Sequence, residues 1–162
     1  MSSVLKSTRI ICGERRKDDK QVFTPVTIDR AGIQPWETHP CSAITPKVGL
    51  ALAFSSGKLA IAAGTTKPEF ICMENRDSAV TAGTMIHVMP VNEHIVFETK
   101  ASAALTSVTV GSKVTLTTDG LKVTATTTGG VAEILEMDGT AAGSKVRVRF
   151  PELQAAAASS NS

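Results

Sequence analysis

Residues 108–150 constrain the fold most, because they read as short strands separated by glycine turns. Apolar residues alternate with Thr, Lys or Arg in segments such as KVTL, LKVTA and KVRVRF. A period of two places one set of side chains against a core and the other set in water. The turns fall at Asp119-Gly120, Gly129-Gly130 and Asp138-Gly139, and the Asp-Gly steps suit type I′ turns. The stretch therefore predicts the antiparallel strands of a small β-domain.

The same alternation predicts further short strands in the first two thirds of the chain. Pro25 confines the earliest of them to a sheet edge, because proline has no N–H for a second neighbour. Asn92-Glu93 is predicted to be a tight turn between the last two strands, whereas residues 131–137 fit either a strand or a helical turn. No sustained helix with caps is indicated, so the predicted class is all-β. The predicted strands cover residues 21–28, 48–54, 58–62, 69–73, 84–91 and 94–99.

Length and composition indicate one β-body with a long extension. The chain has 162 residues, of which 42% are apolar but only 4% aromatic, so aliphatic side chains have to build the core. Residues 44–150 are predicted to form the body, as one unit or as two lobes, 44–99 and 108–150. Residues 1–43 are predicted to be an extended arm that lies on a partner or along its own body. Residues 151–162 are predicted to be a flexible tail.

Positive charge is concentrated in the arm and on one predicted strand. Residues 1–20 hold six Lys and Arg against three Asp and Glu, whereas the remaining residues hold eleven against twelve. A basic arm either contacts nucleic acid or an acidic protein surface, or is simply solvated. Lys145, Arg147 and Arg149 alternate along a strand and predict a basic stripe, to which Lys113 and Lys122 add. Such a stripe serves as a docking surface or as protection against edge aggregation.

The cysteines and histidines match no ligand or nucleophile signature. Cys12, Cys41 and Cys72 are odd in number and far apart, which indicates reduced thiols. His87 and His94, on strands predicted to be neighbours, could form a metal site with Cys72, but their spacing fits no known site. A hydrogen-bonded structural role is expected for His87 instead. The His39-Pro40-Cys41 step places a thiol beside an imidazole without a third group to orient them.

Other patterns that carry chemistry are incomplete. The segment after Cys12 has Asp18 where a phosphate-binding thiolate loop needs arginine, and no glycine-rich nucleotide motif is present. Glu133, Glu136 and Asp138 cluster at a predicted turn rather than in a cleft, which does not suit general acid–base work. No secretory signal is recognisable, and the apolar stretch at residues 48–54 is too short to span a membrane. The sequence predicts neither an enzyme nor a cofactor or metal site.

Two long segments are similar to known proteins. The run ITPKVGLALAFSSGKLAIAAGTTKPEFICME, followed by AGTMIHVMPVNEHIVFET, resembles the small capsid decoration (cementing) proteins of tailed bacteriophages. The matching features are a hairpin with a turn at Gly57, the KPEFI strand at residues 67–71, the strand at 83–90 and the strand at 95–98. The closing meander resembles the small barrel of the same proteins. The resemblance covers residues 44–150.

The resemblance implies a β-barrel or β-tulip body with an extended N-terminal arm, located on the outside of a phage head that assembles in the host cytoplasm. It implies a major capsid protein as partner and a homotrimer as the oligomeric state. Trp36 either anchors the arm on the capsid or plugs its own barrel. The residues expected to contact the partner are Arg9, Ile10, Arg15, Arg16, Val22, Phe23, Trp36, Arg147 and Arg149.

Two other function classes remain open from the sequence. A nucleic-acid-binding small β-barrel could use the basic arm and the stripe, although scarce aromatic residues and a neutral body argue against it. A sugar-binding or enzyme-accessory β-domain would need stacking platforms, and the chain has one Trp and no Tyr. Direct nucleic-acid binding is therefore not the expected function.

Overall fold

The computed structural model describes residues 24–28 and 37–152, and all regular structure in this part of the chain is β-strand. The predicted all-β class is thus confirmed. The strands form two antiparallel five-stranded sheets, called sheet A and sheet B below. In spatial order, sheet A contains β1 (Thr24–Ile28), β7 (Ile95–Lys100), β10 (Lys145–Arg149), β9 (Ala132–Met137) and β8 (Lys113–Val114). Sheet B contains β2 (Glu37–Pro40), β6 (Met85–Pro90), β5 (Phe70–Cys72), β3 (Ala51–Ser55) and β4 (Lys58–Ile61).

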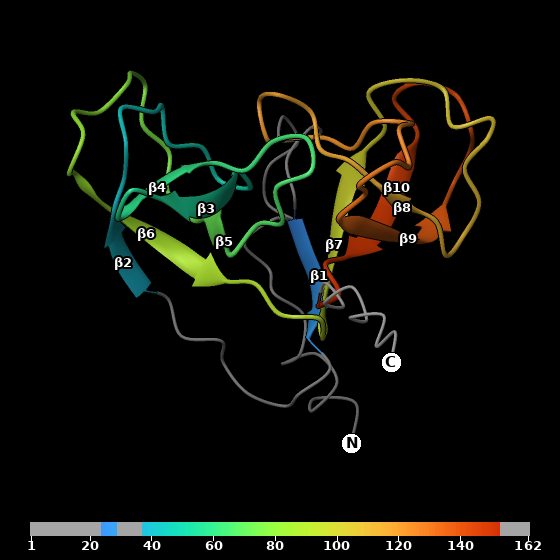
Figure 1. The fold of residues 1–162 in the computed structure, drawn as a ribbon, viewed down its shortest axis with the longest axis horizontal. Helices are drawn as coiled ribbons and strands as arrows, with labels where there is room; N and C mark the ends of the chain where they lie inside the picture. Colours follow the sequence, from blue (N-terminus) through green and yellow to red (C-terminus); the bar gives the residue numbers. More distant parts are fainter. Residues whose placement is uncertain (1–23, 29–36, 153–162) are drawn as a thin grey trace, which may run out of the picture.

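The two sheets lie side by side, and the chain passes between them twice (Figure 1). It leaves sheet A after β1, builds sheet B from β2 to β6, and returns to sheet A at β7. The predicted tight turn at Asn92-Glu93 is present, with the Ile95 N–H donating to the Asn92 carbonyl at 3.2 Å. It does not form a hairpin, because β6 and β7 belong to different sheets. The physical reason is that β2 and β5 already occupy both edges of β6.

One hydrophobic core joins the two sheets. Ala51, Ile71 and Met89 face this core from sheet B, and all three are fully buried. Sheet A contributes the alternate residues that the period-two pattern of β7, β9 and β10 turns inward, among them Phe97. The Phe97 and Phe150 rings pack with centroids 5.6 Å apart. Because the core is continuous, the two sheets form one packed body.

Sheet B also buries its other face. Leu52, Leu59, Ile86 and Val88 are fully buried in a second cluster, which loop residues such as Ile44 help to cover. Strands buried on both faces read as nearly continuous apolar runs, which explains the ALA and FIC sequences of β3 and β5.

Sheet B curls without closing into a barrel. Its two outer strands, β2 and β4, meet at one isolated parallel bridge between Cys41 and Leu59. The Ser42 N–H donates to the Leu59 carbonyl at 2.8 Å, next to the bridge. Each outer strand forms a continuous ladder with one neighbour alone, β2 with β6 and β4 with β3. The expected β-barrel or β-tulip body is thus two packed sheets that do not close into a barrel.

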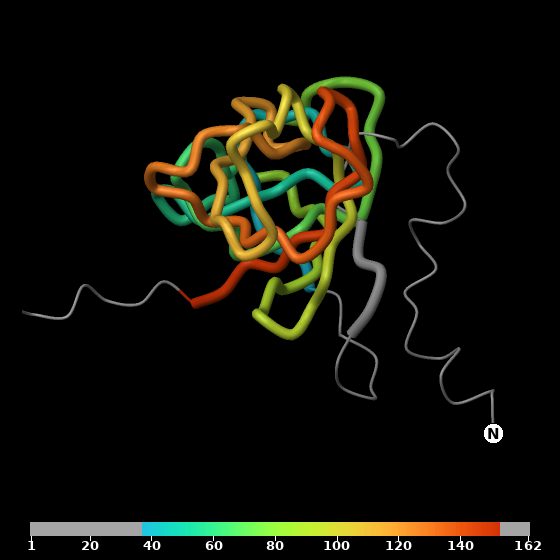
Figure 2. Tube along the Cα trace, turned by 90° about the vertical axis from the view of Figure 1, so that its right-hand side faces the viewer, coloured from blue at the N-terminus to red at the C-terminus, as the bar shows by residue number. Residues whose placement is uncertain are grey.

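A segment after β8 ties the two sheets together. Leu116 forms a bridge with Gly64, and the Ala51 N–H donates to the Gly120 carbonyl at 3.0 Å. Figure 2 shows this part of the chain, in yellow to orange, looping over the flank of the body. Gly120 has φ +67°, and a Cβ there would lie 2.8 Å from Ile61 Cγ2 and 3.2 Å from the Ala51 carbonyl oxygen. The glycine is therefore required both by conformation and by space.

Several local predictions need correction. Type I′ turns need positive φ at both central residues, and neither Asp119 nor Asp138 has it. That pattern occurs instead in the β3–β4 hairpin, at Ser56 (φ 51°) and Gly57 (φ 75°). The ambiguous segment 131–137 is a strand, β9, and the last predicted strand of the meander is present as β10. The part of the meander before them is reduced to β8 and isolated bridges.

Strands also occupy part of the range predicted to be the arm. The predicted edge strand is present as β1, at the end of sheet A. The sequence does not predict β2, which pairs with β6 at the edge of sheet B. Within the described residues, no helix is long and apolar enough to cross a membrane.

Candidate interaction surface

Sheet A presents a face of alternating charges. In β10, Val146 and Val148 are buried while Lys145 and Arg147 are exposed, as the period-two pattern predicts. The strand register places Glu98 of β7 opposite Arg147. On the other side, β9 places further carboxylates opposite the β10 cations: Glu136 opposite Arg147 and Glu133 opposite Arg149.

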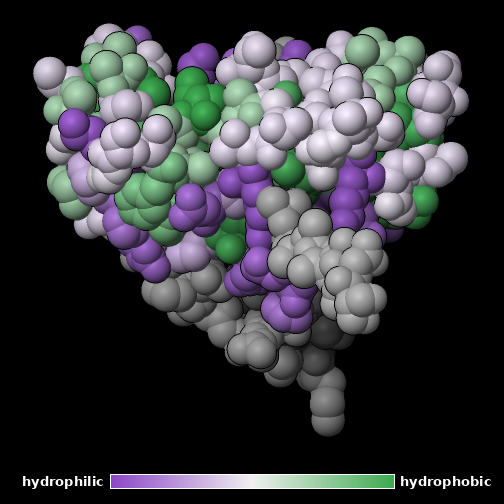
Figure 3. All heavy atoms as spheres, in the orientation of Figure 1, coloured by the Kyte–Doolittle hydropathy of each residue, from purple (hydrophilic) through white to green (hydrophobic). Residues whose placement is uncertain are grey.

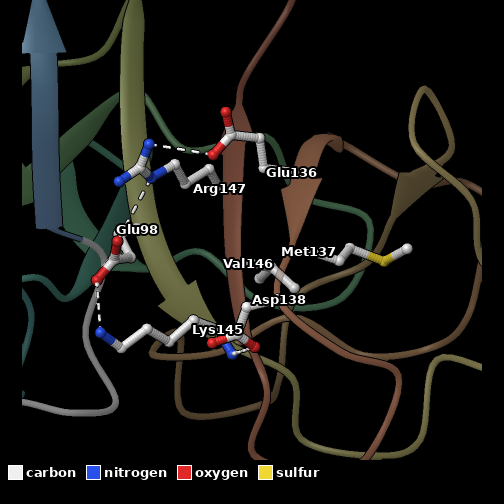
Figure 4. Close-up of a pocket in the computed structure, with 7 residues that line it drawn as sticks. All are labelled: Glu98, Glu136, Met137, Asp138, Lys145, Val146 and Arg147. Atoms are coloured by element: carbon white, nitrogen blue, oxygen red, sulfur yellow. Dashed lines mark hydrogen bonds and ion pairs between the residues drawn. The ribbon is translucent and has the colours of Figure 1, made fainter.

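Lys145, Arg147 and Arg149 each have a carboxylate partner. Figure 4 shows the partners of Lys145 and Arg147. Arg147 Nη1 lies 3.0 Å from Glu136 Oε2, and Arg147 Nε lies 3.5 Å from Glu98 Oε2. Lys145 Nζ lies 3.7 Å from the other oxygen of Glu98. Exposed pairs of this kind contribute about 0–1 kcal/mol each. Their main effect is to fix the direction of the side chains on a polar face.

An open hollow of about 270 Å³ lies on this face. The lining charges pair with one another rather than converge on one point, and the Lys145 N–H donates to Asp138 Oδ1 at 3.1 Å. Hydrophilic residues gather over β7 and β10 in the centre of the molecule (Figure 3). Such a hollow suits the polar rim of a protein interface better than chemistry on a small molecule. Its lining residues are Glu98, Glu136, Met137, Asp138, Lys145, Val146 and Arg147.

The predicted basic stripe is aligned but not free. Lys145, Arg147 and Arg149 project from one face of β10, as the spacing predicts. Three carboxylates, Glu98, Glu133 and Glu136, neutralise them across the neighbouring strands. Lys113 lies opposite Glu133 at the start of β8. The face is therefore a charge-paired surface rather than a positive one.

The histidines lie beside carboxylates and far from a common centre. His87 and His94 were predicted to lie on neighbouring strands, and this is wrong. His87 is on β6 in sheet B, and His94 precedes β7 of sheet A. The hydrogen bond expected for His87 is present, with Nδ1 2.8 Å from Glu74 Oε2. His39 Nε2 lies 2.7 Å from Glu37 Oε2. Among the described residues, no group of three or more His, Cys, Asp or Glu is placed to hold a metal ion.

Glu74 is the hub of a small hydrogen-bond network. The His87 backbone N–H donates to Glu74 Oε2 at 2.9 Å, and Arg76 Nε donates to Oε1 at 2.8 Å. Burial acts to raise the pKa of the Glu74 carboxyl, but the bonds from His87 and Arg76 and the charge of Arg76 bring the pKa below its usual value. The folded protein therefore favours the ionised carboxylate.

The Glu74→Gln variant is expected to lose about 1 kcal/mol of unfolding free energy at neutral pH. The contribution of Glu74 is complete above the ordinary carboxyl pKa of 4.5 and disappears as the pH falls through the lower pKa of the folded state. Chemical denaturation between neutral and acid pH should show a shallower acid slope for the variant. The control is Glu136→Gln, whose side chain is 66% exposed. Equal slopes in wild type and Glu74→Gln would contradict the role of Glu74.

The described thiols are buried and held in the neutral form. Cys41, just after β2, and Cys72, in β5, are free and fully buried. Burial raises the pKa of Cys41, and it raises the pKa of Cys72 to about 11. A thiol with such a pKa is a poor nucleophile and a poor metal ligand at neutral pH. Cys12 lies outside the described residues.

A cluster of aromatic rings on sheet B was not predicted from the sequence. His39, Phe54 and Phe70 come from three different strands, and their ring centroids lie 4.9–5.6 Å apart. Phe54 is 42% exposed, while Phe70 is buried at the rim of the second core cluster. No local sequence pattern indicates this cluster, because its three residues stand far apart in the sequence and meet only through strand pairing.

Most residues expected to contact a partner lie outside the described part of the chain. Only Arg147 and Arg149 can be located, and both are in the charge-paired face. The predictions for the arm therefore stay predictions. The residues concerned are Arg9, Ile10, Arg15, Arg16, Val22, Phe23 and Trp36.

Comparisons with known proteins give a distant structural similarity. No family model matches the sequence, and no curated protein matches it significantly. Among solved structures, the chain is similar to the N base of the head fiber gp8.5 of bacteriophage phi29. The two share 19% sequence identity and a TM-score of 0.45, over 72% of this chain and 94% of that chain. At this level the similarity assigns no function to the chain.

Proposed function

We propose that this chain is a structural protein of a tailed-bacteriophage head, which binds the outer capsid surface and cements neighbouring major capsid subunits. The segments that resemble capsid decoration proteins lie together in the fold. The Gly57 hairpin is β3–β4, the segment 67–71 leads into β5, and the segment 83–90 ends in β6. These strands are all in sheet B, and the segment 95–98 opens the adjoining β7.

The physical logic of the proposal is a rigid body that presents extended contacts. The shared core holds the two sheets together. The charge-paired face keeps the exposed side of sheet A polar and well hydrated. Many copies on a lattice each add a modest interface, and the lattice supplies the effective concentration. Assembly as a homotrimer around a symmetry axis would multiply the contacts of each unit.

Binding to shells assembled from the cognate major capsid protein tests this function. The full-length chain is expected to bind the shell exterior to saturation and to raise the temperature at which shells rupture. Trp36→Ala is expected to weaken binding about 30-fold, the loss of an interface anchor worth about 2 kcal/mol. Val110→Ala is the control, because Val110 is 61% exposed on a loop of the body. Absence of saturable binding would contradict the proposal.

The nucleic-acid-binding alternative is tested by the same preparation. This alternative would use the basic arm and the cations of β10, and the cations of β10 are matched by carboxylates on β7 and β9. Phosphate contacts need cations that are free to displace counterions, so we expect no salt-dependent DNA binding at physiological ionic strength. Tight DNA binding whose affinity falls steeply with salt would favour the alternative.

A further inference from the structure

The aromatic cluster of sheet B leaves a large apolar ring in water. Phe54 is 42% exposed although it contacts two other rings, edge-on to His39 at 5.3 Å and to Phe70 at 5.6 Å. Both neighbours are better covered, Phe70 at 9% exposure and the His39 side chain at 28%. The packed rings hold Phe54 in a fixed position. The cluster thus offers an ordered aromatic face to a partner.

Two carboxylates border these rings. Glu37 Oε2 lies 2.7 Å from His39 Nε2, and Glu69 Oε1 accepts a hydrogen bond from the Phe54 N–H at 3.1 Å. No lysine or arginine among the described residues forms an ion pair with either carboxylate. Aromatic faces beside carboxylates attract guanidinium and ammonium groups through cation–π contact and charge. The chemistry of the site therefore selects a basic side chain.

We propose that the occupant is the basic run Arg15-Arg16-Lys17 of the same chain. The positive charge of the molecule is concentrated in residues 1–20, which hold six cations against three carboxylates. The chain between Arg15 and Thr24 can extend about 30 Å, and a body of this size has a radius of gyration of about 13 Å. The run can thus reach far across the body. Attachment to the same chain gives it a higher effective concentration than any free partner.

Aromatic NMR spectra of the full-length chain test the proposal. The variant Arg15→Gln/Arg16→Gln/Lys17→Gln should shift the ring signals of His39, Phe54 and Phe70, and added salt should shift the wild-type signals in the same direction. The ring signals of Phe97 should stay in place, because Phe97 is buried in the other core cluster. Unchanged signals in the variant would overturn the proposal.

The control variant removes the same charge from other positions of the arm, as Lys6→Gln/Arg9→Gln/Lys20→Gln. Smaller ring shifts than in the first variant support a specific site. Equal shifts would mean that the rings respond to the total positive charge of the arm, and this would overturn the proposal. Dilution should leave the wild-type signals unchanged. A dependence on protein concentration would place the run on a neighbouring copy and contradict binding within one chain.

Discussion

Phe97→Ala is expected to lower the free energy of unfolding by about 3–5 kcal/mol, the range found when a buried phenyl ring is removed from a core. Phe97 is fully buried and packs against Phe150 in the cluster that joins the two sheets. Urea denaturation followed by circular dichroism measures the loss. Phe54→Ala is the matched control, because the same ring there is 42% exposed, and we expect it to cost much less.

The same variant tests whether the sheets unfold together. Ile71 and Met89 of sheet B contact the core that Phe97 fills from sheet A. Hydrogen exchange of their amides should therefore accelerate in Phe97→Ala along with the amides of β7 and β10. Unchanged protection in sheet B would show that the sheets are independent units.

Gly130→Ala is expected to destabilise the protein by about 3 kcal/mol, at the upper end of typical overpacking costs. A Cβ at Gly130 would lie 2.3 Å from both the carbonyl carbon and the carbonyl oxygen of Lys113. These atoms belong to the backbone of β8, so β8 would have to move away from the turn that leads into β9. Thermal unfolding should show a clear drop in Tm.

Gly139→Ala is the control for this substitution. Neither glycine has a positive φ, and the nearest atom to a Cβ at Gly139 is Ser144 Oγ at 3.0 Å, the end of a short side chain that can rotate. We expect a change within about 0.5 kcal/mol. A loss of unfolding free energy in Gly130→Ala no larger than in Gly139→Ala would contradict the prediction. It would mean that the backbone of Lys113 moves away from the added Cβ at little cost.

The strands were predictable because their signal is local. Alternation in KVRVR and the glycine of the β3–β4 hairpin are properties of neighbouring residues, and β10, β3 and β4 follow them closely. Strand partners are not local. The turn at Asn92-Glu93 looked like a hairpin, but β7 pairs with β1 and β10 instead of β6. The four residues of β2 carry no pattern of their own and become a strand only beside β6.

The candidate surface shows the same limit. The alignment of Lys145, Arg147 and Arg149 follows from spacing, so the face they share could be predicted. Their neutralisation could not, because Glu98 and Glu136 reach Arg147 only through the pairing of β7 and β9 with β10. The aromatic cluster likewise requires three strands of sheet B to be placed in order.

The position of β1 has a consequence for folding during synthesis. This strand leaves the ribosome first among the described strands, but its pairing partner β7 follows the whole of sheet B, with Ile28 opposite Ile95. β1 must wait unpaired while sheet B forms, and its docking closes a long loop. β1 is the outermost strand of sheet A and pairs only with β7. We therefore expect it to dock late, onto a core that the other strands have already formed. Slow folding phases should therefore report on the N-terminal strand, and substitutions in β1 should act mainly on these phases.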